Sequence, residues 1–229
     1  MDLVSTCPSG KTVTFSFTDD SPILNVNASA RFANGKAALS FQLGRRGYFE
    51  SACTDMIKST LQSRSVLKDL ELLVAVGDHG LVTTAGLRGP HHDVIAVIGG
   101  PPIEAAQAAL AFADFTVSDT ATGMTMKPTR SDSVLIAEDT TVIVEGRGVL
   151  TALVGKGALA ALPAWQGTPT RYGEVWRRKL DLSPDDEATG YEYFVGFDTV
   201  AAQLTPGSFG DDSSADWAEW LYELKLEAA

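Results

Sequence analysis

The chain has few of the residues that stabilise small secreted folds or bind metal ions. It contains two cysteines and three histidines among 229 residues. Cys7 and Cys53 cannot form a disulfide framework, and their spacing matches no zinc motif. Cys53 lies in a helical pattern, so we expect it to be a small buried side chain. The composition therefore excludes a disulfide-stapled scaffold and a cysteine-based zinc domain.

Long apolar runs are missing as well. No segment of about eighteen apolar residues occurs, and the N-terminus lacks a basic stretch followed by an apolar one. These features argue against a membrane-spanning helix and a cleaved signal peptide. We expect a cytoplasmic protein with no membrane partner.

Positive charge is scarce. The chain has 18 Lys and Arg against 29 Asp and Glu, which gives a net charge of -11. A nucleic-acid partner would need a clustered basic face, and the one basic run, Arg177–Lys179, lies in the more acidic half of the chain. We therefore expect no nucleic-acid partner, and local salt bridges for that run.

The first half of the sequence alternates strand and helix patterns. Residues 12–17 have the two-residue period of a half-buried strand, and Asn34-Gly35 between apolar runs predicts a hairpin. Residues 48–61 place apolar side chains three and four apart, which predicts an amphipathic helix. Strands are predicted at 70–76, 81–85, 93–98 and 115–119, with a helix starting at Pro101 or Pro102.

The second half is β-rich and ends in an aromatic stripe. Strands are predicted at 133–136, 140–144, 148–154, 175–182 and 191–197, and a loop at 205–214 leads to a last helix. In that helix Trp217, Trp220, Leu221 and Leu224 follow helical spacing, with Ser214 as N-cap. This stripe is a candidate interface, and its partner is either its own domain or a second subunit.

Taken together, these patterns predict an α+β fold, with an antiparallel-rich sheet and helices packed on it. We expect a first domain at residues 1–120, a β-rich extension at 121–204 that either forms a domain of its own or completes the same sheet, and a loop and C-terminal helix at 205–229.

One stretch carries a resemblance to a known family. It runs from Leu70 to Asp119 and consists of strand, turn, strand, strand, Gly99-Gly100-Pro101-Pro102 and an alanine-rich helix. This order, with Gly80 and Gly99 nineteen residues apart, resembles the second half of a class III nucleotidyl cyclase domain. The resemblance covers residues 12–119 and rests on spacing more than on identities.

The resemblance implies a two-metal site and a nucleotide. In the family, two carboxylates hold Mg²⁺ or Mn²⁺, which need hard oxygen ligands and stabilise phosphoryl transfer. Asp19 or Asp20 matches the first carboxylate, whereas Asn34 stands where the family has the second. Where the family has an Asn and an Arg that orient ribose and phosphate, this chain has Ile103 and Gln107.

Further departures weaken the catalytic set. The position that selects the base falls on Ala96, which has no hydrogen-bonding side chain, and the segment before the predicted hairpin is shorter than in the family. Arg88, in a glycine-framed turn, is either a binder of a phosphate or carboxylate or a simple turn residue. Asn34, Arg88 and Gln107 are thus the candidate ligand-binding residues.

The histidines give a second candidate metal site. His79, His91 and His92 bracket a predicted strand pair, but adjacent histidines on an extended segment point to opposite faces. Solvent-facing turn residues explain them more simply.

Three functions follow as hypotheses. The first is a degenerate cyclase-like binding or regulatory protein that pairs as a homo-oligomer or with a protein partner. The second is a divergent active nucleotide cyclase using Asp19, Asp20 and Asp78 with Mg²⁺ or Mn²⁺. The third is a structural subunit of a virion or other large assembly, which the abundant strands favour.

Overall fold

The computed structural model describes residues 1–34, 38–155, 157–179, 191–207 and 217–229. The fold is mostly β, with 57% strand and 13% helix. Its strands are, in chain order, β1 (Asp2–Thr6), β2 (Thr12–Ser16), β3 (Ile23–Asn34), β4 (Ala38–Arg45), β5 (Ser59–Leu67), β6 (Leu70–Gly77), β7 (Val82–Arg88), β8 (His92–Gly99), β9 (Phe115–Thr120), β10 (Gly123–Pro128), β11 (Ser133–Val144), β12 (Gly148–Val154), β13 (Thr168–Pro169), β14 (Glu174–Lys179), β15 (Tyr191–Gly196), β16 (Ala201–Pro206) and β17 (Lys225–Ala228).

Helical segments are short. They are α1 (Tyr48–Ser51), a π-helical turn η1 (Ala52–Ile57), α2 (Ala105–Ala108), α3 (Leu110–Ala113), a 3₁₀ turn η2 (Leu159–Ala161) and α4 (Trp217–Glu223). The largest sheet is antiparallel and has the strand order β13-β14-β15-β16-β12-β11-β3-β4-β8-β7-β6-β5. The prediction of an α+β class with helices packed on the sheet is therefore wrong.

The predicted helix over 48–61 shows how helical content was overestimated. The structure ends this helix at Lys58, which has a left-handed φ of 54°, and Ser59 already begins β5. Phe49 and Cys53 are buried as the helical pattern indicates, whereas Leu61 lies in the strand. Leu61 therefore matches the helical spacing by chance, although it belongs to the strand that follows the helix.

The chain forms two compact units. Unit 1 contains Met1–Ser5, Lys11–Val26 and Asp139–Ala229, and unit 2 contains Thr6–Gly10 and Asn27–Glu138. This division falls at other places than the expected boundaries at 120 and 204, because each unit draws on separate stretches of the chain.

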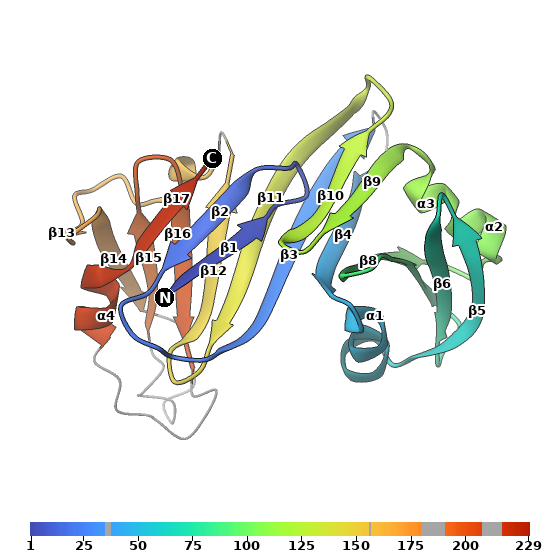
Figure 1. The fold of residues 1–229 in the computed structure, drawn as a ribbon, viewed down its shortest axis with the longest axis horizontal. Helices are drawn as coiled ribbons and strands as arrows, with labels where there is room; N and C mark the ends of the chain where they lie inside the picture. Colours follow the sequence, from blue (N-terminus) through green and yellow to red (C-terminus); the bar gives the residue numbers. More distant parts are fainter. Residues whose placement is uncertain (35–37, 156, 180–190, 208–216) are drawn as a thin grey trace. The chain divides into compact units, whose positions relative to one another are not determined.

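Unit 1 has a small second sheet besides its share of the large one. The small sheet has the order β1-β2-β17, with β17 antiparallel to β2 (Figure 1). Phe15 and Leu226 are cross-strand partners in this sheet, and both are buried. In the large sheet, Leu150 of β12 lies opposite Leu204 of β16, again with both side chains buried. The alternation of buried and less buried residues along these strands is the pattern of half-buried sheets.

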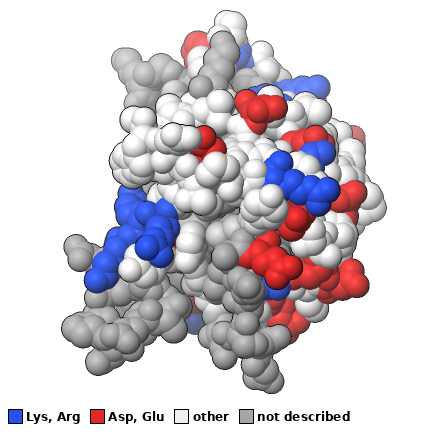
Figure 2. Space-filling model, turned by 90° about the vertical axis from the view of Figure 1, so that its left-hand side faces the viewer, with Lys and Arg blue, Asp and Glu red and all other residues white. Residues whose placement is uncertain are grey.

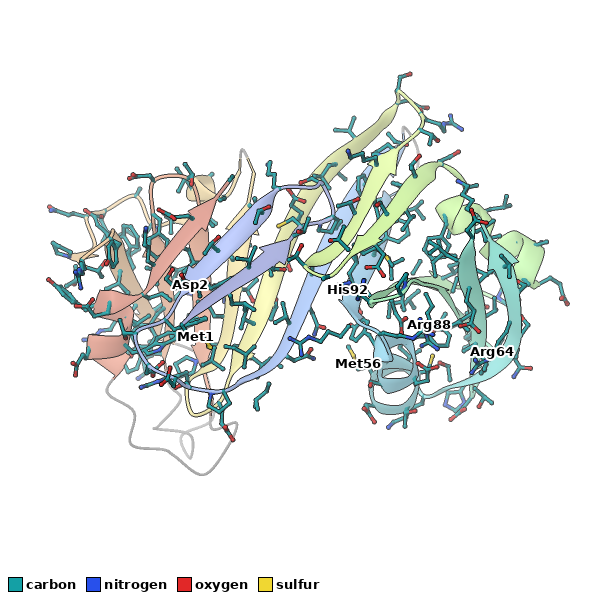
Figure 3. All side chains as sticks on the ribbon, viewed as in Figure 1. Met1, Asp2, Met56, Arg64, Arg88 and His92 are labelled. Carbon is teal, nitrogen blue, oxygen red and sulfur yellow. The ribbon has the colours of Figure 1, made fainter. Side chains whose placement is uncertain are left out.

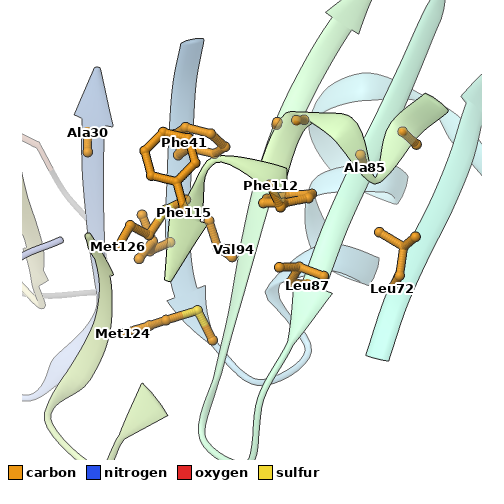
Figure 4. Packing of buried hydrophobic residues seen from close by; sticks show 14 of the residues in the cluster. Ala30, Phe41, Leu72, Ala85, Leu87, Val94, Phe112, Phe115, Met124 and Met126 are labelled. Carbon is orange, nitrogen blue, oxygen red and sulfur yellow. The ribbon is translucent and has the colours of Figure 1, made fainter. Parts of the chain in front are cut away.

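Unit 2 has a buried cluster on each face of its strands, since successive strand residues point to opposite faces. One cluster gathers side chains of β4, β8, β7 and β6 under Phe112 of α3, Phe115 of β9 and Met124 and Met126 of β10 (Figure 4). Phe32, Phe41 and Phe115 meet edge-on there, with centroid separations of 4.8–6.1 Å.

The opposite face of unit 2 packs against α1 and η1. Phe49, Ala52 and Cys53 contact a cluster that includes Leu73 and Ile95. A Cβ added to Gly86 would lie 2.5 Å from Cδ2 of Phe49, so the ring rests directly on the backbone of β7. A glycine inside a strand here permits that close approach.

Candidate functional site

The three carboxylates expected to hold metal ions lie in different units. Asp19 follows β2 in unit 1, and its Oδ2 accepts hydrogen bonds from Arg147 Nη2 at 2.7 Å and Ser21 Oγ at 2.9 Å. Asp20 is exposed next to it, and Asp78 is exposed in the β6–β7 turn of unit 2. Neither compact unit contains all three.

The chemistry of Asp19 is that of a structural ion pair. Burial alone would raise its pKa, but the hydrogen bond from Arg147, the one from Ser21 and the charge of Arg147 together lower the pKa. Arg147 also lies over the ring of Trp220, at 5.8 Å from its centroid. The carboxylate is therefore already balanced by a cation of its own chain.

Arg88 is also committed to its own unit. Its side chain is buried, with Nε and Nη2 donating to the two oxygens of Asp93 at 2.8 Å each, and Nη2 also donating to Glu50. The hydrogen bonds that Arg88 donates to Asp93 and Glu50 raise the pKa of Arg88, and the one to Glu50 lowers the pKa of Glu50. Figure 3 shows Arg88 beside α1. The guanidinium is therefore paired with carboxylates of its own unit and is not presented to a phosphate or carboxylate ligand.

Asp93 connects Arg88 to the start of α1. It is fully buried, and its Oδ2 also accepts the backbone N–H groups of Gly47 and Phe49 at 2.9 and 3.0 Å. These groups belong to the first turn of α1, whose N–H groups have no partner within the helix. Arg88 and Asp93 thus fasten α1 to β7 and β8.

The remaining candidate ligand-binding residues have no common site. Asn34 is the last residue of β3, and its side chain lies outside the described structure. Gln107 is exposed on α2, where its Oε1 accepts the N–H of Glu104 at 3.3 Å as part of a capping box. Of the other positions compared with the cyclase family, Ala96 is buried in β8 and Ile103 precedes α2.

The C-terminal aromatic stripe packs within unit 1. Trp220, Leu221 and Leu224 are buried, and the ring of Trp220 stacks on Phe17 at a centroid distance of 5.8 Å. Trp217 begins α4, and its side chain is not among the described ones. Of the two partners considered for this stripe, its own domain is the one that the structure places against it.

The histidines do not gather around a metal. His92 Nδ1 lies 2.7 Å from Oδ1 of Asp119, whose Oδ2 accepts the backbone N–H groups of His91 and His92. His79 is exposed in a different turn. Among the described residues, no group of three or more His, Cys, Asp or Glu side chains is arranged to hold a metal ion.

The feature of unit 2 with unused bonding capacity is the strand β5. It is the last strand of the large sheet and pairs with β6 alone, as Figure 1 shows. An edge strand presents a row of free backbone N–H and C=O groups along its outer side. Val66, in this strand, is 78% exposed, the highest value among the exposed large apolar residues of the described chain. Arg64 lies on the same strand (Figure 3) and pairs with Glu71 of β6 at 3.3 Å.

The other end of the sheet is protected in ways that β5 is not. There, β13 has two residues, one of them Pro169, which cannot donate a ladder hydrogen bond. The adjoining β14 carries the exposed cations Arg177, Arg178 and Lys179. Figure 2, which views this end of the chain, shows Lys and Arg side chains gathered together. Short strands, proline and charge are the usual devices against edge-to-edge pairing.

By comparison, β5 is nine residues long and has one irregularity, a register shift between Leu61 and Ser63. Sequence reasoning missed this strand, because its serines and Arg64 break the apolar alternation on which strand prediction depends. The signal that could have found it is the β-branched pair Thr60 and Val66 in a stretch without glycine or proline.

Comparisons with protein-family models, with curated proteins and with solved structures gave no match. In the described part of the chain, none of the helices has both the length and the apolar character needed to span a bilayer.

Proposed function

We propose that this protein is a subunit of a protein assembly and that it binds an extended polypeptide strand along β5. The observation that carries the proposal is the nine-residue open edge of β5 with Val66 exposed on it. Strand addition uses main-chain hydrogen bonds for affinity and side-chain contacts for specificity. Of the three hypotheses the proposal is nearest to the third, that of a structural subunit, but it does not require a large particle.

The geometry gives less support to the cyclase-like hypotheses. Both depend on an α+β layout and on carboxylates that share one site. The fold is mostly β, and Asp19 is neutralised by Arg147 in one unit while Asp78 belongs to the other. A nucleotide, Mg²⁺ or Mn²⁺ would therefore need a site that these residues do not form within either unit.

The proposal is tested with a strand as the probe. The probe is a fluorescently labelled peptide with the sequence of residues 59–67, and its anisotropy is followed as the intact protein is added. We expect saturable binding, and at least about a tenfold loss with Val66→Lys, because the substitution removes apolar contact and adds a charge to the edge.

Two controls make the result specific. Leu110→Lys places the same charge at a similarly exposed apolar residue, 68% exposed on α3, and is expected to bind the peptide as the wild-type protein does. A peptide with proline at the positions of Ser63 and Ser65 lacks two backbone N–H groups and is expected not to bind. Absence of peptide binding, or equal loss in both lysine variants, would contradict the proposal.

A further inference from the structure

The proposed function leaves open which strand β5 receives. A strand edge accepts a copy of itself when the two run antiparallel, because a two-fold axis perpendicular to the sheet then relates them. Such an axis keeps every side chain on its own face of the sheet. A residue can therefore lie opposite only itself or a residue an even number of positions away.

The register of β5 limits where the axis can pass. From Ser63 to Leu67 the strand pairs regularly with β6, each residue with its successive partner from Val74 to Leu70. The irregularity lies just before this segment, between Leu61 and Ser63. A self-pairing that avoids the irregularity is thus confined to the five residues 63–67.

Charge excludes two of these five positions. An axis at Arg64 places two guanidinium groups opposite each other, and an axis at Val66 places Arg64 opposite Lys68. Like charges directly opposite each other destabilise a strand pair. Lys68 cannot swing away freely, because its Nζ donates to the carbonyl oxygens of Ala113 and Phe115 at 3.0 and 2.9 Å.

The two end positions fail for related reasons. An axis at Ser63 places Lys58 opposite Lys68 and carries the pairing across the irregular Leu61–Ser63 step. An axis at Leu67 leaves too little of the strand overlapped, since the chain turns at Lys68 and Asp69, both of which have a positive φ.

An axis at Ser65 meets none of these obstacles. Arg64 then lies opposite Val66 of the second copy, so the most exposed apolar side chain is covered by the aliphatic stem of an arginine whose charge already pairs with Glu71. Ser63 lies opposite Leu67 of the second copy, so the pairing stays within residues 63–67.

We infer that the strand bound by β5 is β5 of a second copy of this chain, paired antiparallel about a two-fold axis at Ser65. The inference rests on the proposed strand addition and specifies its partner and register. It joins two large sheets into one continuous sheet, and the protected β13 and β14 end of each copy stops further growth.

A matched pair of cysteine variants tests the register. In Ser65→Cys the two new thiols lie directly opposite, with Cα atoms about 4.5–5.5 Å apart, which a disulfide can bridge. In Ser63→Cys the same substitution on the same face leaves the two thiols displaced by four residues along the strands, roughly 13 Å, which a disulfide cannot bridge. The natural Cys7 and Cys53 are buried, so the wild-type protein serves as the blank.

The experiment oxidises each intact variant with oxidised glutathione and separates the products by non-reducing electrophoresis. We expect a covalent dimer from Ser65→Cys and its complete loss in Ser63→Cys and the wild-type protein. If the β5 peptide binds but Ser65→Cys gives no more dimer than Ser63→Cys, strand addition stands and the second-copy register is overturned. If the peptide does not bind and no variant is linked, both the function and the inference fall.

Discussion

Replacing Asp93 by asparagine is expected to destabilise unit 2 strongly. The carboxylate accepts two hydrogen bonds from Arg88 and one each from the N–H groups of Gly47 and Phe49. Asparagine has the same size as aspartate but no charge, and its amide NH₂ is itself a donor. That NH₂ would face N–H donors of the surrounding groups, whose hydrogen bonds it cannot accept. Among the described residues, Arg88 would keep the ion pairs with Glu50 and Glu71, both of which are more exposed.

The size of the effect follows from burial. Removing one partner of a buried ion pair costs about 3–5 kcal/mol, because the other charge stays in a poorly solvated place. We expect a value near the lower end, about 3 kcal/mol, since Glu50 still balances part of the charge of Arg88. For a chain of this size, such a loss lowers the midpoint of thermal unfolding by roughly 6–12 °C.

The assay is thermal and urea unfolding followed by circular dichroism. Asp132→Asn is the matched control, because Asp132 also accepts two hydrogen bonds from an arginine, Arg130, at 3.0 and 2.9 Å, but on the surface. We expect no measurable change in that variant. Equal midpoints for Asp93→Asn and the wild-type protein would refute the structural role of the pair.

A second variant keeps this prediction testable if Asp93→Asn fails to fold. The double variant with Arg88→Met and Asp93→Asn no longer contains an uncompensated buried cation, so we expect it to be more stable than Asp93→Asn alone. If the double variant loses as much stability, relative to the wild-type protein, as Arg88→Met and Asp93→Asn lose separately and added together, the two residues are not coupled and the reasoning is contradicted.

Three other outcomes follow from the packing and the charges. Gly86→Ala is expected to lose about 1–3 kcal/mol of unfolding free energy, measured in urea, because the new Cβ would lie 2.5 Å from the ring of Phe49. In the control Gly99→Ala the new Cβ meets open space, so its unfolding free energy should stay within about 0.5 kcal/mol of the wild-type value. Cys53 is expected to react slowly with Ellman's reagent until the protein unfolds, because burial both shields its thiol and raises the thiol pKa; rapid labelling of the native protein would contradict this. The pKa of Asp19 is lower in the folded than in the unfolded chain, so the contribution of its carboxylate to stability is complete above the ordinary pKa of 3.8 and is lost as the pH falls through the folded pKa. We therefore expect urea midpoints measured from pH 5 to pH 2.5 to fall less steeply in Asp19→Asn than in the wild-type protein. An unchanged slope would count against the pair with Arg147.

Strands with a strong pattern could be predicted from the sequence. The hairpin strands on either side of Asn34-Gly35 form as expected, with Ala33 opposite Ala38, although the turn at residues 35–37 lies outside the described structure. The strand at 70–76 is confirmed as β6, because a continuous apolar run buried on both faces is unambiguous once it is too short for a helix. The burial of Cys53 is confirmed too.

What could not be predicted depends on tertiary context. The alanine-rich stretch after Pro102 favours a helix by propensity, but it is divided at Ala109 into two single turns, α2 and α3. The strand β17 follows α4 directly and pairs with β2, more than 200 residues earlier, which no local pattern reveals. Other strands that were not predicted, such as β5 and β10, pair with a neighbour in the chain, so their weak local patterns account for the omission.

The candidate site was the least accessible to sequence reasoning. The predicted metal and ligand residues were chosen for their chemistry, and the structure engages Asp19, Arg88 and Gln107 in ion pairs and a cap within their own units. The open edge of β5 depends instead on which strand comes last in the sheet. That order is a property of the fold and has no signature in residues 59–67 themselves.

Backbone amide exchange of the wild-type protein at low and high concentration tests the central claim most directly. Half of the β5 amides face β6 already, and the other half face outward without a partner in the described structure. If β5 binds a strand of a second copy, exchange of residues 59–67 slows as the concentration rises, while exchange in β13 and β14 stays the same. Exchange of residues 59–67 that is independent of concentration, in a sample where light scattering detects association, would contradict the account.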